Sequence, residues 1–289
     1  MQAYARISPS SQDWPSSLEN VEDPPSRLWL RGDRRLLAPA PRVAIVGTRA
    51  PTPYGEAQAA RFSRALVAAG ACVVSGLARG IDSAAHSAAL NAGGGTIAIL
   101  GCGVDAPWPA GRLAERMATE GLLLSEFPPG TRPRRHHFPL RNRLIAGLCS
   151  AVLVVEAAER SGSLVTARWA LSLGVDVLAI PGRVDHPMAR GTLSLLRDGA
   201  TPVGSPEQLL RDVFGVDAEG PLGTDARPGP SDPVEANVYA ALEGESLTAA
   251  EVAARIRADL GEVIAALVGL ELAGWVRLSP GGIYSRHPA

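Results

Sequence analysis

The sequence predicts an α/β protein whose main domain is a doubly wound, mainly parallel sheet, followed by a smaller, mostly helical domain. Short apolar runs recur between residues 43 and 182 without the alternation of a half-exposed strand, as in a sheet covered on both faces. Each run is followed by a stretch of helical periodicity, and many of these stretches end at glycine. Beyond a Pro- and Gly-rich break after residue 215, the pattern becomes mostly helical.

Length and composition limit the class of protein. The 289 residues, 46% of them hydrophobic and 20% charged, suffice for one large domain and a smaller one. No apolar run approaches the roughly 18 residues of a membrane span, and the N-terminus lacks a signal peptide, so we expect a cytoplasmic protein. The three cysteines lie in apolar segments without metal-ligand spacing, so we expect no metal and no cofactor.

The elements follow in order along the chain. Residues 1–41 are rich in proline and serine and are expected to form an extended lead-in. The sheet domain is expected over 42–215, with Asp82 as the N-cap of its second helix. The strands are expected at 43–47, 71–76, 96–101, 122–127, 151–157 and 176–182, and the helices at 54–70, 81–94, 111–121, 140–148 and 163–174.

The last part of the chain predicts a linker and a small domain. Residues 216–232 contain mainly Pro, Gly and Asp and are expected to be a flexible linker. Three helices and a hairpin around a Gly-Gly turn are expected over 233–289, which is the outline of a winged helix-turn-helix.

Ligands of such sheets bind beyond the carboxyl ends of the strands, and the residues there are small, glycine-rich or cationic. Short side chains and helix N-termini, such as the one expected at Ser161–Thr166, favour a phosphate group. "GCGVDA" matches a dinucleotide fingerprint, but Pro107 and Pro109 prevent the helix that such a site requires. We therefore disfavour a nicotinamide or flavin site.

Residues 131–143, "TRPRRHHFPLRNR", contain five arginines although the formal net charge of the chain is only -1. Residues 1–215 contain 23 Arg and 18 acidic residues, a net charge of +5, whereas residues 216–289 contain 5 Arg and 11 acidic residues, a net charge of -6. Two prolines stiffen this loop, and Phe138 adds an aromatic ring among the charges. Guanidinium groups beside an aromatic platform predict binding of single-stranded nucleic acid, whereas duplex recognition needs a helix or ribbon for the groove.

Catalytic signatures are absent from the sequence. It has no lysine, which excludes the P-loop and Schiff-base chemistry, and no G-x-S-x-G or H-E-x-x-H motif. We therefore expect no catalytic residue and favour a binding protein over an enzyme.

Several motifs in a fixed order resemble the DNA processing protein A (DprA/Smf) family of bacteria. They are "VAIVGTR", "SGLARGIDSAAH", "GCGVDAPWP", "LLSEFPPGTRPRRHHFPLRNRLIAGL", "VLVVEAAERSGSLVTARWAL" and "IPG". The resemblance spans about residues 14–203, and the C-terminus resembles the winged-helix domain of many members. It implies an extended Rossmann-like domain that binds single-stranded DNA, forms a homodimer, protects incoming DNA and loads the strand-exchange recombinase RecA during natural transformation.

The resemblance also implies which residues line the DNA site. Those carried over from the family's motifs, together with the loop arginines that stand in for the family's lysines, are Gly47, Thr48, Arg49, Arg132, Arg134, Arg135, Phe138, Arg141, Asn142, Arg143, Ser161, Gly162 and Ser163. We expect Arg49, Arg141 and Arg143 to hold phosphates and Phe138 to stack on a base. Thr48 replaces the serine that is usual in the family, and the family's N-terminal helical domain is missing or reduced.

Two alternatives stay open at this point. A related nucleoside-phosphate hydrolase group carries a glutamate after its glycine-rich loop, which "SGSLVTARWA" lacks. The winged-helix domain is acidic and has no arginine where a recognition helix would lie, so we expect a protein contact or autoregulation of the basic site rather than duplex binding.

Overall fold

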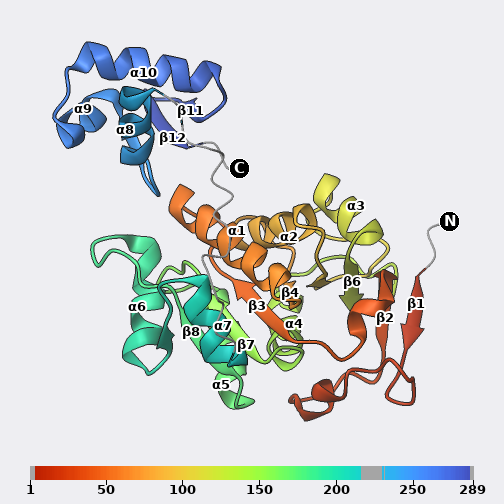
Figure 1. Ribbon diagram of the computed structural model, residues 1–289. Helices are drawn as coiled ribbons and strands as arrows, with labels where there is room; N and C mark the ends of the chain where they lie inside the picture. Colours follow the sequence, from red (N-terminus) through yellow and green to blue (C-terminus); the bar gives the residue numbers. More distant parts are fainter. Residues whose placement is uncertain (1–3, 216–229, 231, 287–289) are drawn as a thin grey trace. The chain divides into compact units, whose positions relative to one another are not determined.

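The computed structural model describes residues 4–215, 230 and 232–286 of the chain (Figure 1). Contacts divide the chain into a sheet unit, Met1–Pro51 with Gln58–Leu222, and a winged unit, Thr52–Ala57 with Gly223–Ala289. The linker expected over 216–232 lies outside the described residues, apart from Pro230 and Asp232.

The sheet unit is built on one large sheet. In the described part of the chain, this sheet has nine strands in the order β1-β2-β6-β5-β4-β3-β7-β8-β9. β3 to β9 run parallel to one another, whereas β2 pairs antiparallel with both β6 and β1. The strands are β1 Ala5–Ile7, β2 Leu28–Gly32, β3 Arg42–Val46, β4 Cys72–Ser75, β5 Thr96–Ile99, β6 Leu122–Ser125, β7 Ala151–Val154, β8 Asp176–Ala179 and β9 Thr201–Pro202. The expectation of a mainly parallel sheet is confirmed.

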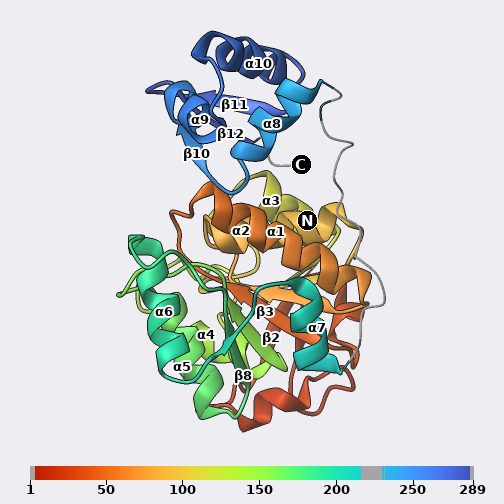
Figure 2. The ribbon, with the colours of Figure 1, turned by 60° about the vertical axis from the view of Figure 1, so that its left-hand side comes forward.

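Helices cover both faces of this sheet (Figures 1 and 2). One apolar cluster joins strand residues such as Ala98 and Leu123 to α2 and α3, and another joins Ala44 and Val46 to α4 and α5. The helices are α1 Pro53–Ala68, α2 Ile81–Asn91, α3 Arg112–Thr119, α4 His137–Gly147, α5 Ser163–Ser172, α6 Arg190–Arg197 and α7 Pro206–Phe214. The doubly wound fold is therefore confirmed, because alternate strand residues are buried against opposite helical layers.

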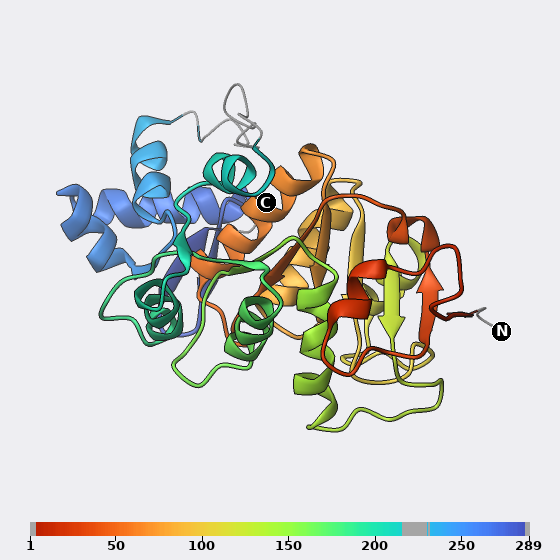
Figure 3. The same cartoon turned by 90° about the horizontal axis from the view of Figure 1, so that it is seen from below.

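The N-terminal segment differs from the extended lead-in expected over 1–41. β2 pairs with β6, with Leu30 opposite Leu124, and β1 pairs with β2, so the sheet begins well before residue 42. Leu18 and Val21 pack in the same cluster as α4, and Gly147 of α4 approaches Val21 so closely that a Cβ would lie 2.2 Å from its Cγ1. Figure 3 shows this red segment beside the yellow-green helix α4. These strands were not predicted because they are short and lie in a segment rich in proline and serine.

Over its described residues 232–286, the winged unit contains three helices and a small sheet. Its elements are α8 Pro233–Ala241, β10 Ser246–Thr248, α9 Ala249–Ile256, α10 Leu260–Leu272, β11 Val276–Ser279 and β12 Ile283–Arg286, and its strand order is β10-β12-β11. Asp232, Thr248 and Asp259 cap the three helices through their side chains. The winged-helix expectation is confirmed, with one strand, β10, that the sequence did not predict.

The chain reverses its direction of winding at β3. From β3 the sheet continues to β4, β5 and β6 on one side and to β7, β8 and β9 on the other. Helices that leave adjacent strands toward opposite faces open a crevice at this point, and ligands of doubly wound sheets bind there. The segments after β3, β4, β5, β6 and β7 therefore form the edge where a site is expected.

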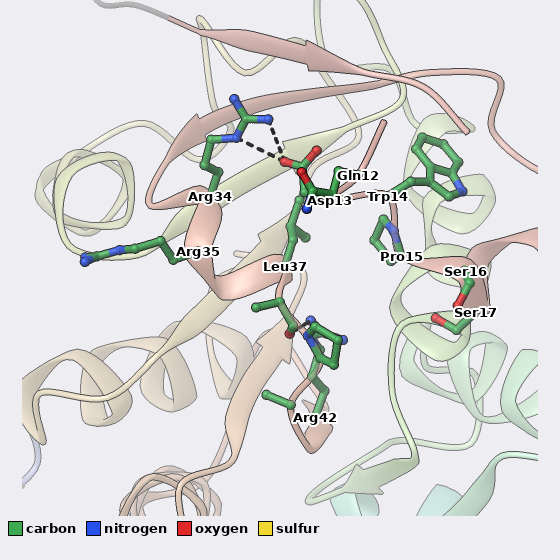
Figure 4. A pocket seen from close by; sticks show the side chains of 13 residues that line it. Gln12, Asp13, Trp14, Pro15, Ser16, Ser17, Arg34, Arg35, Leu37 and Arg42 are labelled. Atoms are coloured by element: carbon green, nitrogen blue, oxygen red, sulfur yellow. Dashed lines mark hydrogen bonds and ion pairs between the residues drawn. The ribbon is translucent and has the colours of Figure 1, made fainter. Parts of the chain in front are cut away.

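A hollow of about 690 Å³ lies at the opposite end of β3 (Figure 4). Its lining includes Trp14, Leu37 and Arg42, and Arg34 donates two hydrogen bonds to Asp13 at 3.0 and 2.7 Å there. Because Arg42 begins β3, this hollow is separate from the edge at the carboxyl ends of the strands.

None of the helices in the described ranges is long and apolar enough to cross a membrane.

Candidate nucleic-acid interface

The turn after β3 is held tightly against its neighbours. The Thr48 amide donates to the Glu156 carbonyl at 2.7 Å, and the Thr48 carbonyl accepts from the Ile81 amide at 3.2 Å. A Cβ on Gly47 would lie 2.6 Å from Ile81 Cγ1 and 2.9 Å from the Glu156 oxygen, so only glycine fits there. The turn is therefore fixed between the ends of β7 and α2, and Arg49 projects from it into solvent.

Phe138 lies between two arginines at this edge. The Arg49 guanidinium carbon is 5.6 Å from the centre of the Phe138 ring, and that of Arg141 is 6.0 Å from it. The ring packs over Gly101, where an added Cβ would lie 3.0 Å from Phe138 Cδ1. Phe138 is half-buried, with an exposed cation on one side and a buried cation on the other. It thus presents a fixed aromatic surface beside Arg49.

α4 begins earlier than the sequence predicts. Phe138 was expected in a loop, but α4 starts at His137, so Phe138 occupies its first turn. His137 fixes this start because its amide donates to the Arg134 carbonyl and its Nδ1 lies 3.0 Å from the Gly101 carbonyl oxygen. Its ring also stacks on Phe127, with 4.1 Å between centres and 18° between planes. Pro139 is compatible with this helix because the first turn needs no amide donor there.

The basic loop before α4 is anchored at its start. The Gly130 amide donates to both carboxylate oxygens of Asp105 at 3.0 and 2.9 Å, and the Gly103 amide donates to the Thr131 carbonyl. The loop arginines are exposed and form no ion pair with another residue of the described chain. They are Arg132, Arg134 and Arg135. Their charges therefore face solvent on the same edge as Arg49.

Arg141 is turned into the protein rather than toward solvent. Its side chain is buried, and Nη1 donates to the carbonyl oxygens of Gly76 and Ile99 at the ends of β4 and β5. Burial lowers the pKa of Arg141 to about 10, although the nearby Asp82 charge opposes this shift. Burial likewise raises the pKa of the Asp82 carboxyl, and the positive charge of Arg141 opposes it.

Asp82 also differs from its expected role as an N-cap. The N-cap of α2 is Gly80, with φ 85°, and Asp82 lies in the first turn. Its Oδ2 accepts from the amides of Gly76 and Ala78 at 3.1 and 3.3 Å. Asp82 thus accepts from the Gly76 amide, and Arg141 donates to the Gly76 carbonyl. Together these two bonds fix the end of β4.

All five N–H groups of Arg143 are used within the protein. The guanidinium donates to both oxygens of Glu126 at 2.8 and 2.7 Å, to the backbone oxygens of Glu22 and Asp23, and to the Leu140 carbonyl. The side chains of Arg143 and Glu126 are only 6% and 18% exposed. Arg143 therefore joins α4 to the end of β6 and to the N-terminal segment.

These contacts correct the expectation for two arginines. Arg141 and Arg143 were expected to hold phosphates, but both guanidinium groups are buried and bonded to backbone or carboxylate oxygens. Arg143 uses all five N–H groups within the protein, whereas Arg141 donates through Nη1 and its Nε has no hydrogen-bond partner among the described residues. Burial turns both guanidinium groups away from an external anion. Their role in this structure is to position the helix that carries Phe138.

Asn142 connects the site to α5. Its Nδ2 donates to the Gly162 carbonyl at 3.3 Å, which ties α4 to the turn before α5. The hydroxyls of Ser161 and Ser163 lie 2.8 Å apart, and Ser163 begins the helix. Gly162 is exposed, and a Cβ there would meet nothing within 4 Å. The helix N-terminus that was expected to attract phosphate is therefore present beside the segment of Asn142.

Arg79 is a candidate site residue that the sequence analysis did not name. It is exposed in the turn after β4 and forms no ion pair within the described residues. The neighbouring Gly80 packs against the turn that carries Arg49. A Cβ on Gly80 would lie 2.4 Å from the Thr48 carbonyl oxygen and 2.9 Å from the Arg49 carbonyl carbon. The signal available was a cation directly after a strand, in the motif "SGLARGID".

Three acidic residues at this edge are engaged internally. Glu126 pairs with Arg143, Asp105 binds the Gly130 amide, and Asp82 binds the Gly76 amide. The exposed charges around Phe138 are therefore mainly arginines, and the edge favours an anionic ligand.

Comparisons with known proteins identify the family of the chain. The family model described as DNA recombination-mediator protein A matches residues 5–214, and a DprA winged helix domain model matches residues 223–282. Protein Smf of Synechocystis sp. is 37% identical over 317 residues, which cover 97% of this chain and 80% of that protein. DNA processing protein DprA of Bacillus subtilis is 41% identical over 206 residues, covering 71% of this chain and 69% of the relative.

Two solved structures share the architecture. DNA processing protein A of Streptococcus pneumoniae has a TM-score of 0.70 at 41% identity, covering 73% of this chain and 75% of that one. DNA processing protein A of Helicobacter pylori, whose single-stranded DNA binding mode has been determined, has a TM-score of 0.67 at 31% identity, covering 73% and 96%. An extended Rossmann-like unit and a winged-helix domain are therefore confirmed.

Proposed function

The chain belongs to the DNA recombination-mediator protein A family, and from that premise we propose that it binds single-stranded DNA along the carboxyl edge of its large sheet. The relative from Helicobacter pylori binds single-stranded DNA, and relatives from two other bacteria are DNA processing proteins. The proposal is that this chain does the same through its own residues.

The observation that carries the proposal is the pair formed by the exposed Arg49 and the half-buried Phe138 at the reversal point of the sheet. The ring offers a stacking surface for a base, and the guanidinium beside it offers charge for a phosphate. Arg79 and the loop arginines extend the positive charge along the same edge. Because a stacked ring accepts any base and an arginine any phosphate, this combination binds without sequence preference.

The turn before α5 contributes backbone amides. Ser161, Gly162 and Ser163 place a helix N-terminus next to Asn142, and Gly162 leaves room for a phosphate to approach. In this proposal Gly47 and Thr48 fix the turn that presents Arg49. Asn142, Arg141 and Arg143 support the site from behind rather than contact the strand.

Beyond binding, we propose that the chain protects incoming strands and loads the recombinase RecA during natural transformation. Family membership supports this role, as does binding that ignores sequence, which suits a protein that must cover any incoming strand. A homodimer would place two such edges on one strand and raise its avidity. We also propose that the protein works by binding in the cytoplasm and not by catalysis, because Asp82, Asp105 and Glu126 at this edge are engaged internally.

Fluorescence anisotropy with a labelled oligonucleotide, single-stranded and duplex, over a salt series tests the binding proposal. We expect strong preference for the single strand and a steep loss of affinity with salt. The triple variant Arg49→Ala, Arg134→Ala and Arg135→Ala should lose most of this binding. Arg197→Ala is the matched control, because Arg197 is exposed at the end of α6, toward the amino ends of the strands.

Equal affinity for single strand and duplex, or unchanged binding by the triple variant, would contradict the proposal.

A further inference from the structure

α10 carries a stripe of exposed aliphatic side chains. These residues are spaced four apart along the whole helix, so they lie on one face. They are Leu260, 45% exposed, Ile264, 44% exposed, Val268, 45% exposed, and Leu272, 85% exposed. A contiguous apolar surface of this kind marks an interaction site in a water-soluble module.

The stripe is not the face that builds the core of the winged unit. The core face of α10 is formed by Val263, Ala266, Leu267 and Leu270, all buried with residues of α8 and α9. Figures 1 and 2 show the other elements of this unit on one side of α10. A surface helix needs one apolar face, and α10 has a second one that nothing in the described unit covers.

Carboxylates border this stripe. Glu262 and Glu271 are exposed on α10, and the helix carries no arginine. Glu235 of α8 lies against Gly269 of α10, with its Oε1 2.3 Å from where a Cβ on that glycine would lie. Phosphates would be repelled by these charges, which argues against duplex DNA on a helix in this position.

The charges of α10 favour a basic partner over a second copy. The ionisable side chains of α10 are Glu262 and Glu271, and both are acidic and exposed. A second copy would add the same negative charges, whereas a basic partner would neutralise them.

We infer that α10 is a docking surface for an amphipathic helix of a partner protein, with an apolar stripe bordered by lysine or arginine. Leu260, Ile264, Val268 and Leu272 would pack along the apolar stripe of the partner, as in helix–helix packing elsewhere. Glu235, Glu262 and Glu271 would meet the basic borders and fix the orientation. This inference does not depend on how the sheet unit binds DNA.

The test uses the full chain and three synthetic peptides of about 18 residues, long enough to form a helix. The first has a leucine stripe bordered by arginines, the second has the same stripe bordered by glutamates, and the third is a scrambled form of the first. Titration calorimetry should show binding of the first peptide only. Sedimentation of the free protein measures self-association in parallel.

Two sets of substitutions locate the binding. The double substitution Ile264→Ser and Val268→Ser should lower the affinity for the first peptide at least about ten-fold, because two contacts in the middle of the stripe are lost. Glu262→Gln with Glu271→Gln should remove much of the preference for arginine borders and flatten the salt dependence of binding. All four positions are exposed, so thermal unfolding should stay near that of the unchanged protein, and Arg197→Ala serves as the control.

Binding of the arginine-bordered peptide that both sets weaken supports the inference. It is overturned if no peptide binds, if the two amphipathic peptides or the scrambled peptide bind equally well, or if Ile264→Ser with Val268→Ser abolishes self-association of the free protein, which would identify a second copy as the occupant.

Discussion

The two halves of the segment 131–143 use the same residue type for opposite purposes. In the first half Arg132, Arg134 and Arg135 are exposed, and none has an ion pair with the described residues. In the second half Arg141 and Arg143 are buried and bonded to backbone and carboxylate oxygens. One half offers charge to a ligand, and the other uses charge to hold α4, with Phe138 in its first turn, in place.

The difference shows that a cluster of arginines in a sequence is not a single functional unit. An exposed guanidinium keeps its solvation and can exchange water for a phosphate at little cost. A buried guanidinium must satisfy its donors within the fold, because an unpaired buried charge is expensive. Substitutions in the two halves should therefore change different measured quantities.

The largest effect is expected from Arg141→Ala. This change leaves the buried Asp82 carboxylate without its counter-charge and the Gly76 and Ile99 carbonyls without a donor. We expect the free energy of unfolding at pH 7 to fall by about 3–5 kcal/mol, measured by urea denaturation.

This deficit should shrink as the pH is lowered. Burial raises the pKa of Asp82 in the folded state, and losing Arg141 raises it further, so the ionised carboxylate destabilises the fold above its unfolded pKa. Below the unfolded pKa of about 3.9 the carboxyl is neutral in both states, and that contribution disappears. A variant with unchanged stability but lost DNA binding would show that Arg141 is a ligand of DNA.

A smaller loss is expected from Arg143→Ala. Glu126 keeps some contact with water, so we expect the free energy of unfolding to fall by about 2–3 kcal/mol. Adding Glu126→Ala should recover part of this loss, because the unpaired carboxylate is then removed. A double variant that is less stable than Arg143→Ala alone would contradict this account of the pair.

Phe138→Ala should mainly reduce affinity for single-stranded DNA. The loss of one stacking surface is expected to cost about 1–3 kcal/mol of binding free energy, measured by anisotropy. The slope of log affinity against log salt should hardly change, because no phosphate contact is lost. A large change in slope would indicate that the ring acts by placing Arg49.

Arg134→Ala should have the smallest effect. We expect the salt slope for single-stranded DNA to decrease by about 0.7, the value for one phosphate contact, with stability within about 0.5 kcal/mol of the unchanged protein. Arg197→Ala is the comparison with equal charge loss. If both variants change the salt slope equally, Arg134 contributes only to the overall charge of the protein and does not contact a phosphate.

The sequence predicted the architecture of the sheet unit well, because buried parallel strands and their helices leave a strong periodic signal. It missed β1 and β2, which are short and lie in a segment rich in proline and serine, and it placed the start of α4 too late, at 140 instead of His137. Phe138 therefore belongs to a helix rather than to a loop.

The sequence predicted where in the fold the candidate site lies, but not which of its arginines are buried. The segments after β3, β6 and β7 do meet at one edge, as parallel strands require. The partners of Arg143 include the Glu22 and Asp23 carbonyls, more than a hundred residues away in the chain, and those of Arg141 are strand ends. Such tertiary contacts leave no local signal in the sequence, whereas Arg79 could have been found by its place after a strand.

Arginine-selective chemical modification, with and without a single-stranded oligonucleotide, tests most directly which arginines bind and which support. Mass spectrometry of the unmutated protein would follow each arginine separately. We expect Arg49, Arg79 and the loop arginines to react in the free protein and to be protected by the oligonucleotide, while Arg141 and Arg143 stay unreactive in both states. Reaction of Arg141 or Arg143 in the free protein with protection by DNA, or no protection of Arg49, would contradict the account.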